Sequence, residues 1–375
     1  MRRGRFAAAI AGALAIVVLA GCGTAQRAAP VPVEDVSAAD RARDAERQVA
    51  LAAALNPLVA EAAAVAPSEP AVEVKAASPA TDMPSMGHVF QSLNNCGPAA
   101  VVMALSTLGV NASQEAARLA LRGEDVRRGM GPQGVDGWVK EQFGLRSMWR
   151  NNGTNDLVKK LVANGFAPMV TQWMIDPEAS RISHWRTVRG YDDARGVFYV
   201  NDSMLGRGVA LTYDWFGRNW QPFSYRYMVI YRPEDEPKLR TIVGDDWIDA
   251  KMRRGFYERT KAEALAWNTS AAWLAHGEAS YQYGEFREAV AAFDRGMALG
   301  SPTGVFTMHS SYPNALRALG RQADADAAAG RLVNLTPGVV AAAAPPIDER
   351  ILDLVAERER AAWYAALSEE QRPTR

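Results

Sequence analysis

The sequence predicts an α+β domain, with N-terminal helices packed on an antiparallel sheet, followed by an all-α region that resembles helical repeats. Apolar residues recur with helical spacing through residues 97–165. Segments rich in Val, Tyr, Phe and Trp, bounded by Gly, Asp or Pro, follow over 166–233. The block 245–375 is Ala-rich and helical in pattern throughout. Helices followed by strands, instead of alternating with them, favour an antiparallel sheet with segregated helices.

Residues 1–22 have the layout of an export signal. A basic start precedes a short apolar run that ends in Leu19-Ala20-Gly21-Cys22. Such a run is too short to span a bilayer comfortably. The segment resembles a bacterial lipoprotein signal, which implies that Cys22 becomes the lipidated first residue of the mature chain. The alternative is a plain secretory signal with an incidental cysteine. We therefore expect a protein of the bacterial cell envelope, lipid-anchored to a membrane that it does not span, and facing the extracytoplasmic or periplasmic side.

Residues 23–85 are mostly Ala, Pro, Glu and Val. The stretch 35–66 could form one helix, with Ser37 as a possible cap. The stretch 67–87 has too little hydrophobic bulk for a core. The segment 23–85 is therefore predicted to be a tether between the membrane and a folded domain.

The middle domain, residues 86–237, contains four predicted helices. They cover 97–109, 113–123, 131–144 and 154–165, with Ser113 and Thr154 as candidate N-caps. Predicted strands follow at 166–175, 184–192, 196–202, 208–214 and 225–233. Residues 191–196 form the predicted turn of a hairpin between the second and third of these strands.

The C-terminal block, residues 245–375, carries a helix-turn-helix pattern. Large and small residues alternate where two antiparallel helices would interlock, at Trp273, Gly277, Gly284, Phe286, Ala289 and Phe293. The pattern resembles a tetratricopeptide repeat, and a weaker copy follows at 313–337. Two copies are too few to bury a core alone, so they must pack on the helix predicted at 347–367 or on the middle domain. The resemblance implies a possible protein-binding surface, and the alternative is a helical hairpin without a binding role.

Composition argues against several functions. The formal net charge is zero and no basic patch stands out, so nucleic acid is an unexpected partner. The four histidines lack the spacing of a metal site, and the glycine-rich stretch 129–134 lacks the ending of a phosphate loop. No cofactor and no metal are therefore expected.

Cysteine use draws attention to Cys96. The chain has two cysteines, and if Cys22 carries lipid, Cys96 has no partner for an internal disulfide. Exported proteins fold in oxidising surroundings, where a lone thiol must be buried or used. Pro98 suits the first turn of a helix, which places Cys96 at a helix N-terminus. The partial positive charge there lowers the pKa of a thiol.

A thiol nucleophile needs an imidazole and a group that orients it. His184 opens a predicted strand of the same domain, whereas His276 and His309 lie in the C-terminal block and His88 in a loop. Pairing across the 191–196 turn brings Asp202 back towards His184. The sequence thus predicts a Cys, His and Asp constellation in one domain.

The segments 91–109 and 183–202 resemble the C39-like peptidases, which are papain-type cysteine peptidases, and the resemblance extends over residues 86–233. It implies that Cys96 is the nucleophile and His184 the general base. It further implies that Asp202 orients the imidazole, and that Gln91 donates to the oxyanion with the Cys96 backbone N–H. The family often has Asp-Pro where this chain has Asp202-Ser203.

We therefore expect a membrane-anchored extracytoplasmic cysteine peptidase that acts on a peptide or protein substrate. Two other classes remain open. One is an acyl-transfer enzyme of the same chemistry, such as a cell-wall amidase or a transglutaminase-like enzyme. The other is an inactive peptidase-like scaffold that binds peptides, with the repeat-like helices as the docking surface. For Cys96 itself, the alternative is a buried structural thiol. Members of the family fused to transporters cut after double glycine, and no transporter is present here, so that preference is not expected to apply.

Overall fold

The computed structural model describes residues 73–125, 129–174, 182–300, 308–335 and 349–366. The predicted signal segment with Cys22 and the part of the predicted tether up to residue 72 lie outside the described residues. No helix in the described ranges is long and apolar enough to cross a membrane.

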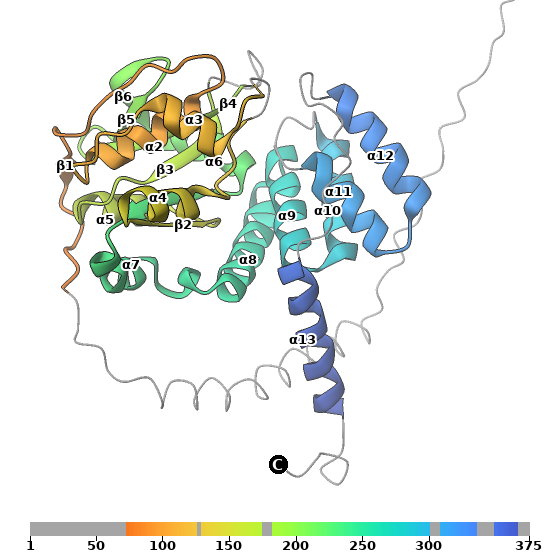
Figure 1. The fold of residues 1–375 in the computed structure, drawn as a ribbon. Helices are drawn as coiled ribbons and strands as arrows, with labels where there is room; N and C mark the ends of the chain where they lie inside the picture. Colours follow the sequence, from red (N-terminus) through yellow and green to blue (C-terminus); the bar gives the residue numbers. More distant parts are fainter. Residues whose placement is uncertain (1–72, 126–128, 175–181, 301–307, 336–348, 367–375) are drawn as a thin grey trace, which may run out of the picture.

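The first part of the chain forms an α+β domain, as predicted, around a seven-stranded sheet (Figure 1). The strand order is β2-β7-β3-β4-β5-β6, with β1 also paired to β4, and every pairing is antiparallel. The strands are β1 (Ala80–Asp82), β2 (Arg146–Arg150), β3 (Met169–Trp173), β4 (Ser183–Asp192), β5 (Val197–Asp202), β6 (Gly206–Thr212) and β7 (Tyr227–Tyr231).

Helices cover both faces of this sheet. Side chains of β7 alternate between two cores: Met228 and Ile230 pack with α2 and α4, whereas Tyr227 and Val229 pack with α5 and α6. Every residue of β7 is buried as a result. The helices of this domain are α2 (Cys96–Ser106), α3 (Gln114–Leu121), α4 (Val135–Phe143), α5 (Asn155–Ala163) and α6 (Tyr213–Trp220), with the short turn η1 (Gln221–Phe223).

The strand β1 lies in the segment that composition assigned to the tether. It is held to β4 by backbone pairing and by Arg189, whose Nε and Nη2 donate to the two carboxylate oxygens of Asp82 at 2.7 and 2.8 Å. A side chain at Gly190 would put its Cβ 2.6 Å from the Thr81 carbonyl oxygen, so this close crossing requires glycine. A strand fixed in this way needs no hydrophobic bulk of its own, which is why composition does not indicate it.

The described residues that follow the sheet are helical, also as predicted. Their elements are η2 (Pro233–Asp235), α7 (Glu236–Val243), η3 (Gly244–Trp247), α8 (Asp249–Trp267), α9 (Ser270–Tyr283), α10 (Phe286–Leu299), α11 (Met308–Ala318), α12 (Gln322–Leu335) and α13 (Glu349–Ala366). Helices α9 and α10 form a closely packed pair, in which Gly277 faces the ring of Phe293 and Gly296 faces Leu274. The interlocking expected of Gly277 and Phe293 is therefore present, and the identity of the hairpin as a tetratricopeptide repeat stays a prediction.

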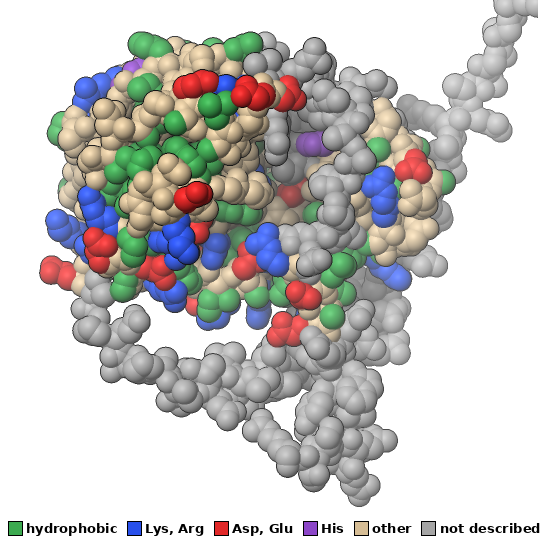
Figure 2. All heavy atoms as spheres, viewed as in Figure 1, with side chains coloured by type: hydrophobic (Ala, Val, Ile, Leu, Met, Phe, Trp, Pro, Cys, Tyr) green, Lys and Arg blue, Asp and Glu red, His purple; other side chains and the backbone are tan. Residues whose placement is uncertain are grey.

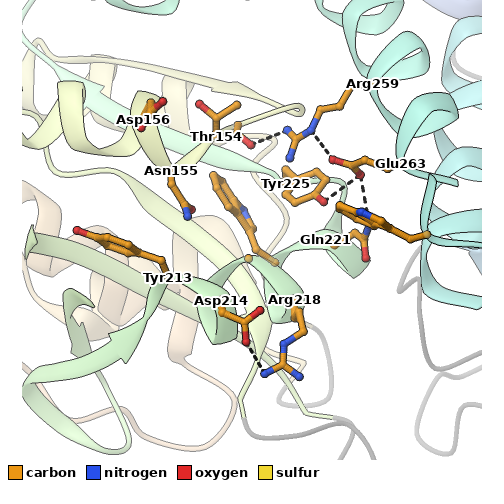
Figure 3. Close-up of a pocket in the computed structure, with 14 residues that line it drawn as sticks. Thr154, Asn155, Asp156, Tyr213, Asp214, Arg218, Gln221, Tyr225, Arg259 and Glu263 are labelled. Atoms are coloured by element: carbon orange, nitrogen blue, oxygen red, sulfur yellow. Dashed lines mark hydrogen bonds and ion pairs between the residues drawn. The ribbon is translucent and has the colours of Figure 1, made fainter. Parts of the chain in front are cut away.

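Polar contacts join α8 to the α+β domain (Figure 3). On α9, Oε1 of Gln282 accepts a hydrogen bond from Nδ2 of Asn151 at 2.7 Å. Arg259 donates to the Gly153 carbonyl oxygen at 3.0 Å, and its guanidinium carbon lies 3.8 Å from the centre of the Tyr225 ring. Glu263 accepts hydrogen bonds from Tyr225 and Gln221. A cavity of about 330 Å³ lies at this junction, bordered by α5, α6, η1 and α8. The helical region is thus packed against the first domain instead of being linked to it by a free hinge.

Charges of both signs are mixed on the face shown in Figure 2, over the lower part of the α+β domain. That distribution agrees with the balanced composition of the chain, which has 42 Lys and Arg against 42 Asp and Glu.

The packing of α9 on α10 generates a first prediction. In Gly277→Ala the new Cβ would lie 2.7 Å from a ring carbon of the fully buried Phe293. Overpacking of this kind costs about 1–3 kcal/mol, and we expect a lower midpoint in thermal unfolding followed by far-UV circular dichroism. Gly137→Ala is the matched control, because Gly137 lies inside α4 with open space around its Cβ position. There the midpoint should stay the same or rise, and an equal loss in both variants would contradict the proposed packing.

Candidate active site

Cys96 is the first residue of α2. The side chain of Asn95 donates to Ser92 and accepts from Arg122 instead of capping the helix, which leaves the first backbone N–H groups open. One of them, that of Gly97, hydrogen-bonds to the Cys96 sulfur. The helix behind it is buried on all sides from Gly97 to Leu105. The predicted position of the thiol at a helix start is therefore the observed one.

The imidazole of His184 lies between the Cys96 thiol and Asp202. Its Nε2 is 2.9 Å from Oδ1 of Asp202, and the thiol hydrogen-bonds to the same imidazole. Because Nε2 faces the carboxylate, Nδ1 is the nitrogen left for the sulfur. The imidazole and the carboxylate are buried, whereas Cys96 is partly exposed. The structure thus brings the three predicted residues into one hydrogen-bonded row that ends at Cys96, a residue that is partly exposed.

Asp202 also accepts hydrogen bonds from the turn that follows it. The backbone N–H groups of Met204 and Leu205 donate to Oδ1 at 2.8 and 2.9 Å. On the other side, Nε of Arg186 donates to Oδ2 at 2.8 Å. Both carboxylate oxygens are therefore held, and the carboxylate cannot rotate away from His184 without losing several bonds.

Arg186 is a residue of this site that sequence reasoning missed. It is fully buried, and its Nη atoms donate to the carbonyl oxygens of Trp173 and Met174 at 3.1 and 2.6 Å, and to Oε1 of Gln172 at 3.2 Å. The signal that could have found it is strand alternation. Residues 184 and 186 point to the same face of β4, and Arg186 lies directly opposite Asp202 in the register of β4 and β5.

Gln91 is held by Ser203. Its Oε1 accepts from the Ser203 hydroxyl at 2.7 Å, and its backbone N–H donates to the Ser203 carbonyl oxygen at 2.9 Å. The amide Nε2 is therefore the end of the Gln91 side chain that is left to donate elsewhere. The serine that departs from the Asp-Pro of the resembling family thus has a defined partner, which sequence reasoning did not identify.

The loop that carries Gln91 is fixed from α3. The Gln114 side chain accepts from the Ser92 backbone at 2.9 Å and donates to the Phe90 carbonyl oxygen at 2.9 Å. Arg122 donates to the Leu93 carbonyl oxygen at 3.0 Å. His88, which the sequence left in a loop, places Nε2 2.9 Å from the Asp202 carbonyl oxygen. Several independent bonds therefore set the path of the chain into Cys96.

The electrostatics favour a charge-separated pair. Burial alone raises the pKa of the Cys96 thiol, but the hydrogen bond to His184, the charge of its imidazole and the backbone N–H groups of Trp185 and Gly97 bring that pKa below its ordinary value. Burial lowers the pKa of His184, yet the hydrogen bonds to Asp202 and Cys96 raise it on balance. Burial raises the pKa of Asp202, and the bonds to His184 with the charge of Arg186 more than reverse that effect. The shifts of Cys96 and His184 both favour a thiolate beside an imidazolium.

The four predicted residues Cys96, His184, Asp202 and Gln91 thus lie in one region of the α+β domain, and Cys22 lies outside the described residues. The junction cavity of Figure 3 is a different place, since none of these four residues lines it. In the described ranges no group of three or more His, Cys, Asp or Glu side chains could hold a metal ion. The arrangement can activate a sulfur nucleophile next to a proton donor.

A helix that begins at a cysteine is thus packed on an antiparallel sheet that carries the histidine and the aspartate. Residues 80–228 match the model of the Peptidase_C39 like family, so this segment of the chain is similar to that family. A solved structure described as a candidate C39-like peptidase from Bacillus anthracis is similar at 12% sequence identity and a TM-score of 0.35, covering 41% of this chain and 98% of that chain. No match was found among curated proteins.

The lowered pKa of Cys96 gives a prediction about thiol reactivity. Alkylation by iodoacetamide requires the thiolate, so the rate should stay high at pH values well below the ordinary cysteine pKa of about 8.5. His184→Ala removes the group that lowers the pKa and should move the inflection of the rate to higher pH. Mass spectrometry of the labelled peptide measures the rate at Cys96, and Cys96→Ala reports labelling elsewhere. An inflection near the ordinary value in the unmodified protein would contradict the ion pair.

Proposed function

We propose that this protein is a cysteine peptidase that hydrolyses peptide bonds at Cys96. The observation that carries the proposal is the row of hydrogen bonds from Cys96 through His184 to Asp202, with Arg186 and two backbone N–H groups holding the carboxylate. The match of residues 80–228 to the C39-like family supports peptide as the substrate class.

In the first half of the proposed reaction, the Cys96 thiolate attacks the carbonyl carbon of the scissile peptide bond. The negative charge that forms on the carbonyl oxygen is stabilised by Nε2 of Gln91 and by the backbone N–H of Cys96. One such donor typically contributes about 3 kcal/mol to lowering the barrier. The His184 imidazolium then gives its Nδ1 proton to the leaving amine as the C–N bond breaks, which leaves a thioester on Cys96.

In the second half, water replaces the amine. Neutral His184 takes a proton from the water as the oxygen bonds to the thioester carbon. The C–S bond breaks, the thiolate and imidazolium are restored, and the product leaves as a carboxylic acid that gives its proton to the solvent. Throughout both halves, Asp202 stays ionised and keeps the imidazole in the orientation that presents Nδ1 to the sulfur.

We also propose that the peptidase is anchored at the cell envelope through lipid on Cys22, facing the extracytoplasmic side. The lipoprotein-like ending of residues 19–22 motivates this placement. The interlocked pair of α9 and α10 motivates a further role for the C-terminal helices as a repeat-like surface for a protein partner. Metabolic labelling with an alkyne-tagged palmitate, compared in the full chain and in Cys22→Ser, tests the anchor.

Three substitutions test the catalytic proposal. Cys96→Ala and His184→Ala should abolish cleavage of denatured casein. Asp202→Asn should lower kcat by orders of magnitude, because an amide does not stabilise the imidazolium. Cleavage products are measured by mass spectrometry, and circular dichroism checks that each variant is folded. Casein cleavage that persists in Cys96→Ala would contradict a thiol peptidase.

A primary amine in the same assay separates peptidase from acyl transferase. If dansylcadaverine is incorporated into casein and no peptide bond is cut, the thioester is passed to amines and the protein is transglutaminase-like. If muropeptides are cut and casein is not, the substrate is the cell wall. If Cys96 is reactive and none of these substrates is turned over, the domain serves as a peptide-binding scaffold.

Ser203 should act on catalysis only through Gln91. Losing one hydrogen bond of about 1 kcal/mol corresponds to roughly fivefold in rate, so we expect Ser203→Ala to lower kcat about fivefold with little change in KM. In the Gln91→Ala background the same substitution should have no further effect, while Ser203→Thr should retain most of the activity. Equal effects of Ser203→Ala in both backgrounds would show that the hydroxyl does not act through Gln91.

A further inference from the structure

Large apolar side chains are exposed around the candidate active site. Phe90 and Leu93 are 68% and 73% exposed, and Ile182, Met204 and Leu205 are 47%, 45% and 51% exposed. These five account for nearly half of the large hydrophobic residues that are exposed in the described part of the chain. Single exposed apolar residues are ordinary, but a group of them marks a place of contact.

Each of these residues adjoins a residue of the site. Phe90 precedes Gln91, and Leu93 lies in the loop that leads into Cys96. The backbone N–H groups of Met204 and Leu205 donate to Asp202, so their side chains start from the turn that holds the carboxylate. The two segments are also joined, because the Gln91 backbone donates to the Ser203 carbonyl oxygen at 2.9 Å.

Ile182, the fifth of these exposed residues, lies immediately before the first residue of β4. Positions two apart on an extended chain point to the same face, so Ile182 shares the face of His184. We call these five residues, Phe90, Leu93, Ile182, Met204 and Leu205, the apolar rim.

The apolar rim is free of charge. Residues 88–95, 182–185 and 203–206, which carry it, contain no Asp, Glu, Lys or Arg. Arg186, the nearest cation along β4, is fully buried and bonded to Asp202. A charged substrate side chain would therefore lose water against these three segments without meeting an opposite charge that belongs to them, whereas an apolar side chain has no hydrogen bonds to water to lose.

From the apolar rim we propose the substrate class: an extended, uncharged peptide segment with large aliphatic or aromatic side chains beside the scissile bond. This inference rests on the proposed peptidase function of the same site. The rim residues lie on the loop that leads into Cys96, on the turn that follows Asp202 and on the chain that enters β4 two positions before His184, so we expect a peptide that reaches the sulfur to contact them. Side chains of Leu or Phe size on the peptide bury apolar surface on both partners.

The test begins with the cleavage specificity of the full-length protein. A library of peptides from a proteome digested by an unrelated protease is incubated with the protein and with Cys96→Ala. We expect the Cys96-dependent cleavage sites to be enriched in Leu, Ile, Phe and Met beside the cut. Cys96-dependent cleavage at Gly-Gly or at charged residues would overturn the inference and leave the peptidase function standing. The absence of any Cys96-dependent cleavage would overturn the peptidase function and the inference with it.

A substitution in the rim then tests its role directly. Leu93→Ser should raise KM for a Leu-rich fluorogenic peptide about tenfold, which is typical for one apolar contact, and should alter kcat less. Leu265→Ser is the matched control, because Leu265 is 66% exposed on α8 and outside the apolar rim. If Leu93→Ser leaves KM unchanged and instead weakens binding to phosphatidylcholine vesicles, the rim is a membrane contact and the proposal is wrong.

Discussion

The arrangement of the site depends on one buried charge, the carboxylate of Asp202. Taking a carboxylate out of water costs several kcal/mol unless donors replace the lost solvent. Here the donors are the imidazole of His184, the guanidinium of Arg186 and the backbone N–H groups of Met204 and Leu205. Two of the donors come from β4 and two from the turn between β5 and β6, so the charge that needs satisfying also fixes the imidazole. Because both carboxylate oxygens of Asp202 already accept hydrogen bonds, the carboxylate is fixed in position and holds the His184 imidazole in a single orientation.

The need to satisfy buried charge with hydrogen-bond partners extends from Asp202 into the sheet. Arg186 brings a second buried charge, which is neutralised by Asp202 and hydrogen-bonded to carbonyl oxygens at the end of β3, those of Trp173 and Met174. The ends of β3, β4 and β5 are thereby tied to each other where α2 begins, because the Cys96 thiol bonds to His184. The site therefore rests on rigid strand ends and a helix start instead of on loops alone, which is the support that a reactive geometry needs. Removing either charge would leave the other buried without its partner.

The sequence predicts the parts of this structure that depend on local chemistry. Pro98 marks a helix start and so places Cys96, and the turn at 191–196 brings Asp202 towards His184. It misses the parts that depend on tertiary partners. Strand β1 has little hydrophobic bulk and forms because Gly190 allows it to approach β4 closely. Strand β2 and helix α6 carry mixed polar and aromatic residues, and this pattern does not distinguish a helix from a strand. Arg186 resembles any strand arginine until the register places it opposite Asp202.

Ser203 shows how a departure from a family pattern can be compensated locally. A proline after Asp202 would restrict the turn through its ring, and it would offer neither a backbone N–H nor a hydroxyl. Serine leaves the turn to be fixed by bonds: the Met204 and Leu205 N–H groups go to the carboxylate, and the Ser203 hydroxyl goes to Gln91. The residue next to the proposed orienting acid thus also holds the proposed oxyanion donor. Because Asp202 and Ser203 are covalent neighbours, a movement that displaced one of these groups would displace the other. The two electrostatic parts of the proposed mechanism are therefore positioned together, by one short turn at the end of β5.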